Sequence, residues 1–388
     1  MKTFIASLAL AATGVLATGG AAAETLRIGV VGSLSGPGTA WGTAILGAAQ
    51  LAAQDVNAKG GLDVAGKKYT IDVVAYDDKY KAGDSLTAMN RLIFDDKINI
   101  VMGPTGTAPA LAVIPLAGDN KVITMTMAWG DKVLSPNLKY SFRPVVPAQV
   151  FAAPQIRWVV QKLGVKRVGA LFPNDASGQD ASAVYESAYE AAGAKLVSKE
   201  FFERDRIDFV PLLTRVLAKE IDAFELDGNA PDTAGLLVKQ LRELGFKGPI
   251  VSTGGDAVAE IVRIAGKAAT ENLYVHQPVD LALPAIKRYA QRYTGKYGMP
   301  MNGFSPFFYA NLEMLFESMK RAGTVSDTDK IRGAMLSLKS FDTLVGKSSW
   351  MGQAKWGSNQ QLSAPVYIGL VKNGSVGIVA TCTPEKCE

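Results

Sequence analysis

Two loops of this sequence carry residues whose types could bind a small anion. The first, residues 32–41, is rich in glycine and serine and ends at Trp41, and the second places Thr105, Gly106 and Thr107 where a helix is expected to begin. Backbone N–H groups at a helix N-terminus, together with Ser and Thr hydroxyls, are suited to hold a carboxylate. The pattern therefore predicts a carboxylate site covered by an indole ring. A tryptophan of the core and ordinary capping threonines are the alternatives.

Four further loops place polar or aromatic residues at comparable positions. One ends in Ala128 and Trp129, which adds a second large aromatic ring. The other three loops belong to the second half of the chain and include Ser177, Asn229 and Gly254. Each of these three could contact a ligand, and each is equally explained as part of a turn or a helix cap.

Residues for catalysis or metal binding are scarce. The chain has one histidine, His276, and no H-E-x-x-H, C-x-x-C or G-x-S-x-G motif. Its glycine-rich loops match neither the dinucleotide fingerprint nor the phosphate loop. The adjacent Asp77 and Asp78 are expected to brace the following turn and not to form an acid–base pair. We therefore predict a binding protein and not an enzyme, with no catalytic residue, no metal site and no cofactor.

The loops follow predicted strands that alternate with predicted helices. In the first half, strands are expected at 26–31, 69–75, 98–102 and 122–127. The same alternation resumes after the prolines Pro144 and Pro147 and is typical of parallel sheets covered by helices. In such sheets ligands bind at the carboxyl ends of the strands. Because about 365 residues follow the N-terminal leader, more than one core usually holds, we expect an α/β protein with two doubly wound parallel-sheet lobes.

The N-terminus, the charge and the cysteines limit location and partners. Residues 1–23 combine an early cation, an apolar run and small residues at the end, the three parts of a secretory signal peptide, so we expect cleavage after Ala23. The formal net charge of +5 is spread along the chain, which predicts no nucleic-acid partner. Cys382 and Cys387 both lie in the tail, where they would form a short disulfide loop in an oxidising compartment or remain as two free thiols.

The stretch from residue 35 to residue 78 carries a family resemblance. It contains Ser-Gly-Pro at 35–37, Trp41-Gly42, Asn-Ala-Lys-Gly-Gly at 57–61 and Tyr-Asp-Asp at 76–78. In this order and spacing the chain resembles the branched-chain amino acid type of ABC-transporter substrate-binding proteins, which are type I periplasmic binding proteins. The resemblance extends over essentially the whole mature chain. It implies a monomeric periplasmic receptor that closes on its ligand about a hinge and delivers it to a membrane permease.

Domain boundaries and site residues are also implied by the resemblance. Lobe 1 would comprise residues 24–145 and 277–350, and lobe 2 residues 146–276 and 351–388. The third crossing between the lobes would lie near 345–355. By position, the residues implied to contact the ligand are Trp41, Thr105, Gly106, Thr107, Ala108, Ala128, Trp129 and Phe304 in lobe 1, and Ser177, Asn229 and Gly254 in lobe 2.

Two positions depart from the family pattern and bear on the ligand. Members specific for aliphatic amino acids anchor the ligand ammonium with acidic residues, and the matching positions here are near Pro147 and Gly254, neither of which is acidic. A buried ammonium without a partner is unfavourable, which disfavours amino acids unless Asp175 or Asp256 reaches the site. We therefore expect a small organic acid, with an aromatic carboxylate as first choice and a branched-chain amino acid as second.

Other classes of protein share some of these features. A sensory binding protein that reports to a membrane receptor would show all of them. A secreted hydrolase on a two-lobed scaffold would turn over esters or amides. A sugar-responsive repressor of the same fold is opposed by the export signal and by the lack of an N-terminal helix-turn-helix. We expect a solute-binding protein of an ABC importer.

Overall fold

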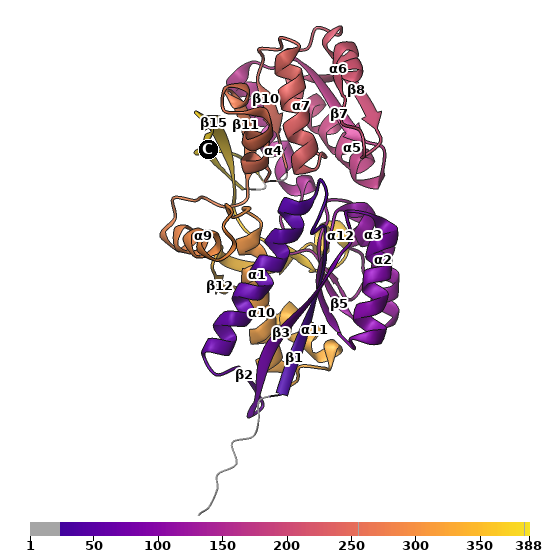
Figure 1. The fold of residues 1–388 in the computed structure, drawn as a ribbon, viewed down its shortest axis with the longest axis vertical. Helices are drawn as coiled ribbons and strands as arrows, with labels where there is room; N and C mark the ends of the chain where they lie inside the picture. The colour runs from indigo at the N-terminus through magenta and orange to yellow at the C-terminus, as the bar shows by residue number, and fades with distance from the viewer. Residues whose placement is uncertain (1–23, 255, 384) are drawn as a thin grey trace, which may run out of the picture.

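Two lobes stacked along the long axis of the molecule contain most of the chain (Figure 1). The computed structural model describes residues 24–254, 256–383 and 385–388. The expected signal peptide, residues 1–23, lies outside the described residues. Within the described part of the chain, no helix is both long and apolar enough to cross a membrane.

The sheet of lobe 1 has six strands in the order β2-β3-β1-β4-β5-β6. The strands are β1 (Glu24–Gly32), β2 (Leu62–Val64), β3 (Lys67–Asp77), β4 (Ile100–Thr105), β5 (Ile123–Met127) and β6 (Ser141–Phe142). All neighbours are parallel except β2 and β3, which form an antiparallel hairpin. In β1, Val30 and Val31 are both fully buried, on opposite faces of the sheet. A strand that is apolar on both faces requires helices on both sides.

Helices cover both faces of this sheet. On one face lie α1 (Thr39–Ala58), α9 (Pro284–Tyr297), α10 (Ser305–Ala322) and α11 (Thr328–Ser337), and on the other α2 (Ala82–Asn90), continued by the π-helix η1 (Arg91–Asp95), and α3 (Thr107–Asp119). The short 3-10 helix η2 (Asp131–Val133) follows β5. Helix α10, predicted at 307–321, packs against α1 although more than 200 residues separate them. Lobe 1 is therefore completed by a segment from the second half of the sequence.

The sheet of lobe 2 has seven strands in the order β16-β15-β11-β10-β9-β7-β8. The strands are β7 (Arg167–Pro173), β8 (Lys195–Phe202), β9 (Ala223–Glu225), β10 (Ile250–Ser252), β11 (Leu273–Gln277), β15 (Val366–Lys372) and β16 (Ser375–Cys382). Its helices are α4 (Ala148–Leu163), α5 (Ala176–Ala191), α6 (Val210–Leu217), α7 (Pro231–Glu243), α8 (Val258–Ala265) and the 3-10 turn η3 (Ala268–Thr270). The prediction of two doubly wound lobes is confirmed.

One edge of this second sheet is antiparallel, unlike the parallel sheet that was expected. β15 pairs antiparallel with both β11 and β16. β15 and β16 are joined by Asn373 and Gly374, whose φ angles are +53° and +75°. Two consecutive left-handed residues make the tight turn that joins antiparallel strands, and Asn-Gly is the pair that tolerates it best. The tail is tied to β16 by a disulfide between Cys382 and Cys387.

A small third sheet lies where the chain returns to lobe 2. It consists of β12 (Phe341–Thr343), β13 (Gly346–Met351) and β14 (Gln361–Ser363), with α12 (Gln353–Trp356) between the last two strands. β14 pairs with β13. Next to β6, the Arg143 N–H donates to the Gln360 carbonyl oxygen just before β14, and the Arg143 carbonyl oxygen accepts from the N–H of Leu362 in β14. After β14, the chain returns to the lobe 2 sheet at Val366, the first residue of β15. We therefore keep the two-lobe division as a proposal but move its third crossing from 345–355 to the two residues between β14 and β15.

Candidate functional site

A small cavity lies between the lobes, at the carboxyl ends of the parallel strands of both sheets. Its lining residues are Trp41, Tyr80, Gly106, Thr107 and Trp129 of lobe 1, and Ser177, Ala181, Asp227 and Gly228 of lobe 2. The volume is about 30 Å³, which is room for about one water molecule. A ligand as large as an amino acid or a benzoate therefore enters only if the lobes separate or the rings turn.

Aromatic rings form the lobe 1 wall of the cavity. The rings of Trp41 and Trp129 lie nearly parallel, with centroids 6.2 Å apart and planes at 25°. Tyr80 packs beside Trp41 at 5.9 Å, and Phe304 meets Trp129 edge to face at 5.4 Å. Flat apolar faces of this kind suit a ring or a branched aliphatic side chain.

The N-terminus of α3 supplies the polar part of this wall. Gly106 caps the helix with a φ of +91°, and a Cβ there would lie 2.8 Å from the Tyr80 ring, so only glycine fits. Thr107 Oγ1 accepts a hydrogen bond from the Gly130 N–H at 2.9 Å, which fixes the loop that carries Trp129. The Thr107 N–H donates to Ser177 Oγ of the other lobe at 3.1 Å. The amide expected to hold a carboxylate is therefore used, in this closed form, to join the lobes.

A buried cation lies behind the Trp129 loop. Arg143 is fully buried, and its Nη1 donates to the carbonyl oxygens of Ala128, Trp129 and Gly130 at 3.4, 3.3 and 3.0 Å. Among the described residues its Nη2 has no hydrogen-bond partner and no carboxylate forms an ion pair with it. Burial lowers the pKa of Arg143 to about 9, so the side chain still carries its charge at neutral pH. The positive charge of Arg143 favours an anion nearby.

Lobe 2 contributes a hydroxyl and a carboxylate. Ser177 stands in the first turn of α5, where Asp175 caps the helix by accepting from the N–H groups of Ser177 and Gly178 at 2.9 and 3.1 Å. Asp227 follows β9, is 6% exposed and accepts a hydrogen bond from the hydroxyl of Tyr185. Burial raises the pKa of Asp227 to about 6.

The structure brings together only part of the predicted set. Trp41, Gly106, Thr107, Trp129 and Ser177 line the cavity. The other predicted residues do not line it: Thr105, Ala108, Ala128, Asn229, Gly254 and Phe304. Of these six, Phe304 supports Trp129 from behind, and Asn229 donates to the carbonyl oxygens of Leu171 and Leu226, which holds the loop after β9.

Sequence reasoning missed three side chains and a glycine of the lining. Asp227 and Gly228 belong to a loop that was recognised, but the prediction took Asn229 from it. Ala181 lies one turn after Ser177 on α5 and could have been found from helical spacing. No signal marked Tyr80, which reaches the cavity from the turn after β3. Neither Asp175 nor Asp256, the acids considered for an ammonium, lines this cavity.

The remaining chemically suggestive residues have structural roles. Asp77 accepts from the N–H groups of Leu34 and Lys79, and Asp78 accepts from Ser85 Oγ, so both brace loops as expected. His276 is buried in β11 and stacks on Phe151, and burial lowers its pKa to about 3. Among the described residues, no group of three His, Cys, Asp or Glu side chains is placed to hold a metal ion.

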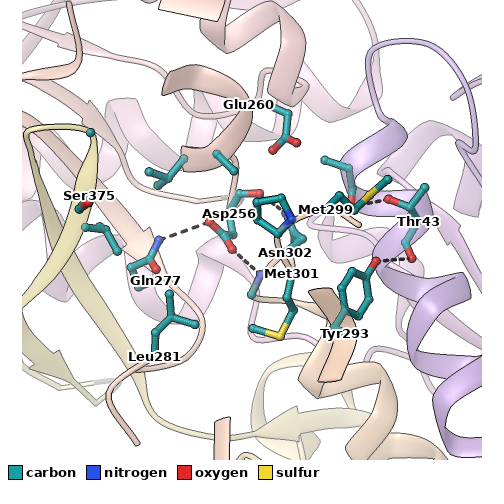
Figure 2. Close-up of a pocket in the computed structure, with 17 residues that line it drawn as sticks. Thr43, Asp256, Glu260, Gln277, Leu281, Tyr293, Met299, Met301, Asn302 and Ser375 are labelled. Carbon is teal, nitrogen blue, oxygen red and sulfur yellow. Dashed lines mark hydrogen bonds between the residues drawn. The ribbon is translucent and has the colours of Figure 1, made fainter. Parts of the chain in front are cut away.

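A second, larger cavity of about 320 Å³ lies beside the hinge (Figure 2). Asp256 stands at its centre, accepts from Gln277 Nε2 at 3.3 Å and also accepts from the Gly303 N–H. The Asp256 carbonyl oxygen accepts from Asn302 and, at 3.2 Å, from Trp41 Nε1. This region joins the lobes and adjoins Trp41, but neither the α3 N-terminus nor Trp129 lines it. We therefore place the ligand site in the smaller cavity, where the carboxyl ends of both sheets meet.

Known proteins match this chain over most of its length. A family model described as "Periplasmic binding protein" matches residues 25–375. The Leu/Ile/Val-binding protein BraC3 of Rhizobium johnstonii is 25% identical over 349 residues, which cover 90% of this chain and 91% of that protein.

Two solved structures share the fold. The branched-chain amino acid transporter substrate binding protein LivJ from Streptococcus pneumoniae, in complex with isoleucine, has a TM-score of 0.78 and 24% identity, with 94% of this chain and 99% of that chain covered. A solute binding protein of an ABC transporter from Rhodopseudomonas palustris BisB5, in complex with 3,4-dihydroxy benzoic acid, has a TM-score of 0.78 and 23% identity, with 93% and 98% covered. The members of this group are substrate-binding proteins of transporters and not enzymes. The chain belongs to the periplasmic binding protein family, as a type I protein of the branched-chain amino acid class.

Proposed function

We propose that this ABC-transporter solute-binding protein captures a small carboxylate, with an aromatic acid as first choice, in the cavity between its lobes. The observation that carries the proposal is the lobe 1 wall, where the indoles of Trp41 and Trp129 flank the N-terminus of α3. The rings would cover the apolar body of the ligand. Helix N-terminal amides, with Arg143 behind them, would favour its carboxylate.

A branched-chain amino acid is the second candidate, and one observation favours it. Asp227 lines the cavity, so an acid is available for an ammonium group although the two positions named from the family pattern are not acidic. Relatives of both kinds support keeping both candidates: LivJ was solved with isoleucine and the R. palustris protein with 3,4-dihydroxy benzoic acid.

The cycle follows from the contacts between the lobes. The protein reaches the periplasm after cleavage behind Ala23, binds its ligand as a monomer, and closes because contacts such as Thr107 to Ser177 and Trp41 to Asp256 exist only when the lobes meet. The permease recognises the closed form. A sensory partner in place of a permease would use the same cycle.

A panel of ligands tests the proposal directly. Thermal unfolding is measured with benzoate, 3,4-dihydroxybenzoate, leucine, isoleucine and, as the neutral control, benzamide. A bound carboxylate raises the unfolding temperature, because saturating ligand stabilises by RT ln(1 + [L]/Kd). Calorimetry then gives Kd for each hit. Stabilisation by benzamide equal to that by benzoate would reject the carboxylate site.

A further inference from the structure

The cavity wall of lobe 2 holds a carboxylate with no basic partner. Asp227 is one of nine lining residues, and among the described residues Tyr185 is the one side chain that donates to it. In the described part of the chain no lysine or arginine forms an ion pair with it. A buried acid of this kind is costly unless a donor meets it, and burial accordingly raises its pKa.

Hydrogen bonds to Glu225 hold the loop that carries the Asp227 carboxylate. Glu225, two residues earlier and fully buried, accepts from the Asp227 N–H at 3.1 Å and from the Thr253 N–H at 3.1 Å. It also accepts from the hydroxyls of Tyr189 and Thr253 at 2.7 and 2.8 Å. Glu225 thus ties the loop after β9 to the loop after β10. A loop held at so many points keeps Asp227 in one place, as a recognition residue requires.

Gly254 provides the space that the Asp227 carboxylate occupies. A Cβ atom at Gly254 would lie 2.7 Å from Asp227 Oδ2 and 2.8 Å from both Cγ and Oδ1. No side chain fits at position 254 while Asp227 keeps this orientation. The acidic side chain in the lobe 2 wall of the cavity is therefore Asp227, and the loop after β10 contributes only Gly254 beside it.

The two walls of the cavity have opposite electrical character. On the lobe 1 side lie the N-terminus of α3 and, behind the Trp129 loop, the buried Arg143. On the lobe 2 side lie Asp227 and, beneath it, Glu225. A ligand that matches both walls carries a carboxylate and, as a separate group, a hydrogen-bond donor.

We propose that Asp227 is the specificity-determining residue of the site and accepts a hydrogen bond from a donor group that the ligand carries in addition to its carboxylate. This inference rests on the proposed function. The donor is a ring hydroxyl if the ligand is an aromatic acid and an ammonium group if it is an amino acid. Acids of the same shape without a donor leave Asp227 with its internal donor Tyr185 but no donor from the ligand, and they bind less tightly.

Matched ligand pairs test this in the wild-type protein. Calorimetry compares benzoate with 3-hydroxybenzoate and 4-hydroxybenzoate, and 4-methylpentanoate with leucine, which differ from each other only in the ammonium group. In one of these sets we expect the donor-bearing ligand to bind at least about 10-fold more tightly, the gain of a hydrogen bond to a charged group. The set that shows the gain identifies the donor.

Variants then assign the preference to Asp227. Asp227→Asn keeps the size of the side chain. In this variant we expect the Kd values of the donor-bearing and the donor-free ligand to differ by no more than about threefold. The Kd of the donor-free acid itself should change by less than about threefold relative to the wild-type protein. Gly254→Ala tests the same point with Asp227 intact, because the added methyl group displaces the carboxylate. Asp232→Asn on α7 removes an equal charge outside the cavity and leaves the preference unchanged.

The outcomes separate this inference from the proposed function. If the acids bind but no set shows a preference for the donor-bearing ligand, Asp227 does not accept a hydrogen bond from the ligand. The inference then fails, and the proposed carboxylate site is unaffected. If Asp227→Asn weakens both members of a pair equally, the residue is only structural and the inference is overturned. If none of the acids binds, both proposals fail.

Discussion

The two faces of the cleft are made from the same kind of strand-to-helix loop but present different chemistry. The lobe 1 face is aromatic, with Trp41 and Trp129 beside the N-terminus of α3. The lobe 2 face is polar, with the Ser177 hydroxyl and the Asp227 carboxylate. Neither face alone can contact both the apolar body and the polar groups of a ligand, so the site is complete only when the lobes meet.

The same residues that face the cavity also hold the lobes together. Trp41 donates from its indole to the Asp256 carbonyl oxygen, and the Thr107 amide donates to Ser177. Arg204 of lobe 2 also lies over the Tyr80 ring of lobe 1, with its guanidinium carbon 4.5 Å from the ring centroid. Closure and ligand recognition therefore share side chains, and changes on either face should alter both.

The largest loss of affinity is expected when the aromatic face is removed. Trp41→Ala deletes a ring of the cavity wall and the hydrogen bond to Asp256, so we expect Kd to rise at least about 10-fold, given the free energy of burying a large apolar side chain. Calorimetry with the best ligand of the panel measures this. Trp158→Ala, on α4 away from the cavity, is the control. Unchanged affinity in Trp41→Ala would reject the pocket assignment.

A smaller loss is expected when the helix N-terminus is disturbed. Thr107→Val removes the acceptor of the Gly130 N–H at a residue that lines the cavity, so we expect carboxylates to bind about 5- to 10-fold more weakly and amides to change less. Thr105→Val is the matched control, because the Thr105 hydroxyl is buried with no partner among the described residues. Its Kd should stay within about twofold. Equal losses in both variants would contradict the placement of Thr107 at the ligand.

The lobe 2 hydroxyl should matter less. Ser177→Ala removes one neutral hydrogen bond between the lobes, so we expect Kd to rise by about threefold. Calorimetry at several temperatures measures it. Tighter binding in this variant would show instead that Ser177 competes with the ligand for the Thr107 amide.

His276 belongs to neither face of the cleft, so its protonation is expected to change the stability of the protein and not its affinity for the ligand. Its pKa is lowered by burial to about 3, below the value of the unfolded chain, so the unfolded state binds this proton first as pH falls. The free energy of unfolding should therefore decrease from about pH 6.5 towards pH 3, by at most about 1.4 kcal/mol per pH unit from this group. Because His276 is the one histidine of the chain, its NMR signal is unambiguous. A titration between pH 6 and 7 would contradict the buried position.

The sequence allowed the fold and part of the site to be predicted because both depend on local patterns. Strand-like runs followed by helical patterns marked the βα units, and the residues directly after the strands included Trp41, Thr107, Trp129 and Ser177. Trp129 lies in the loop after β5, and Trp41, Thr107 and Ser177 lie in the first turn of the helix that follows a strand, so the strand before each residue sets its position. Which side chain of a loop faces the cavity was not predictable. After β9 it is Asp227 and not Asn229, because Gly228 adopts a φ of +88° between them and Asn229 turns back to two carbonyl oxygens.

The class of the molecule follows from local patterns in the sequence: two sheets of alternating strands and helices, with glycine, threonine and tryptophan where strands end. These features follow from residue spacing and helix and strand periods, which act over a few neighbours. Long-range packing, in contrast, places Asp227 in the space beside Gly254, Arg143 behind the Trp129 loop, and the Thr107 amide at Ser177. Those contacts join residues 13 to 70 positions apart, and packing across such separations leaves no periodic mark in the chain.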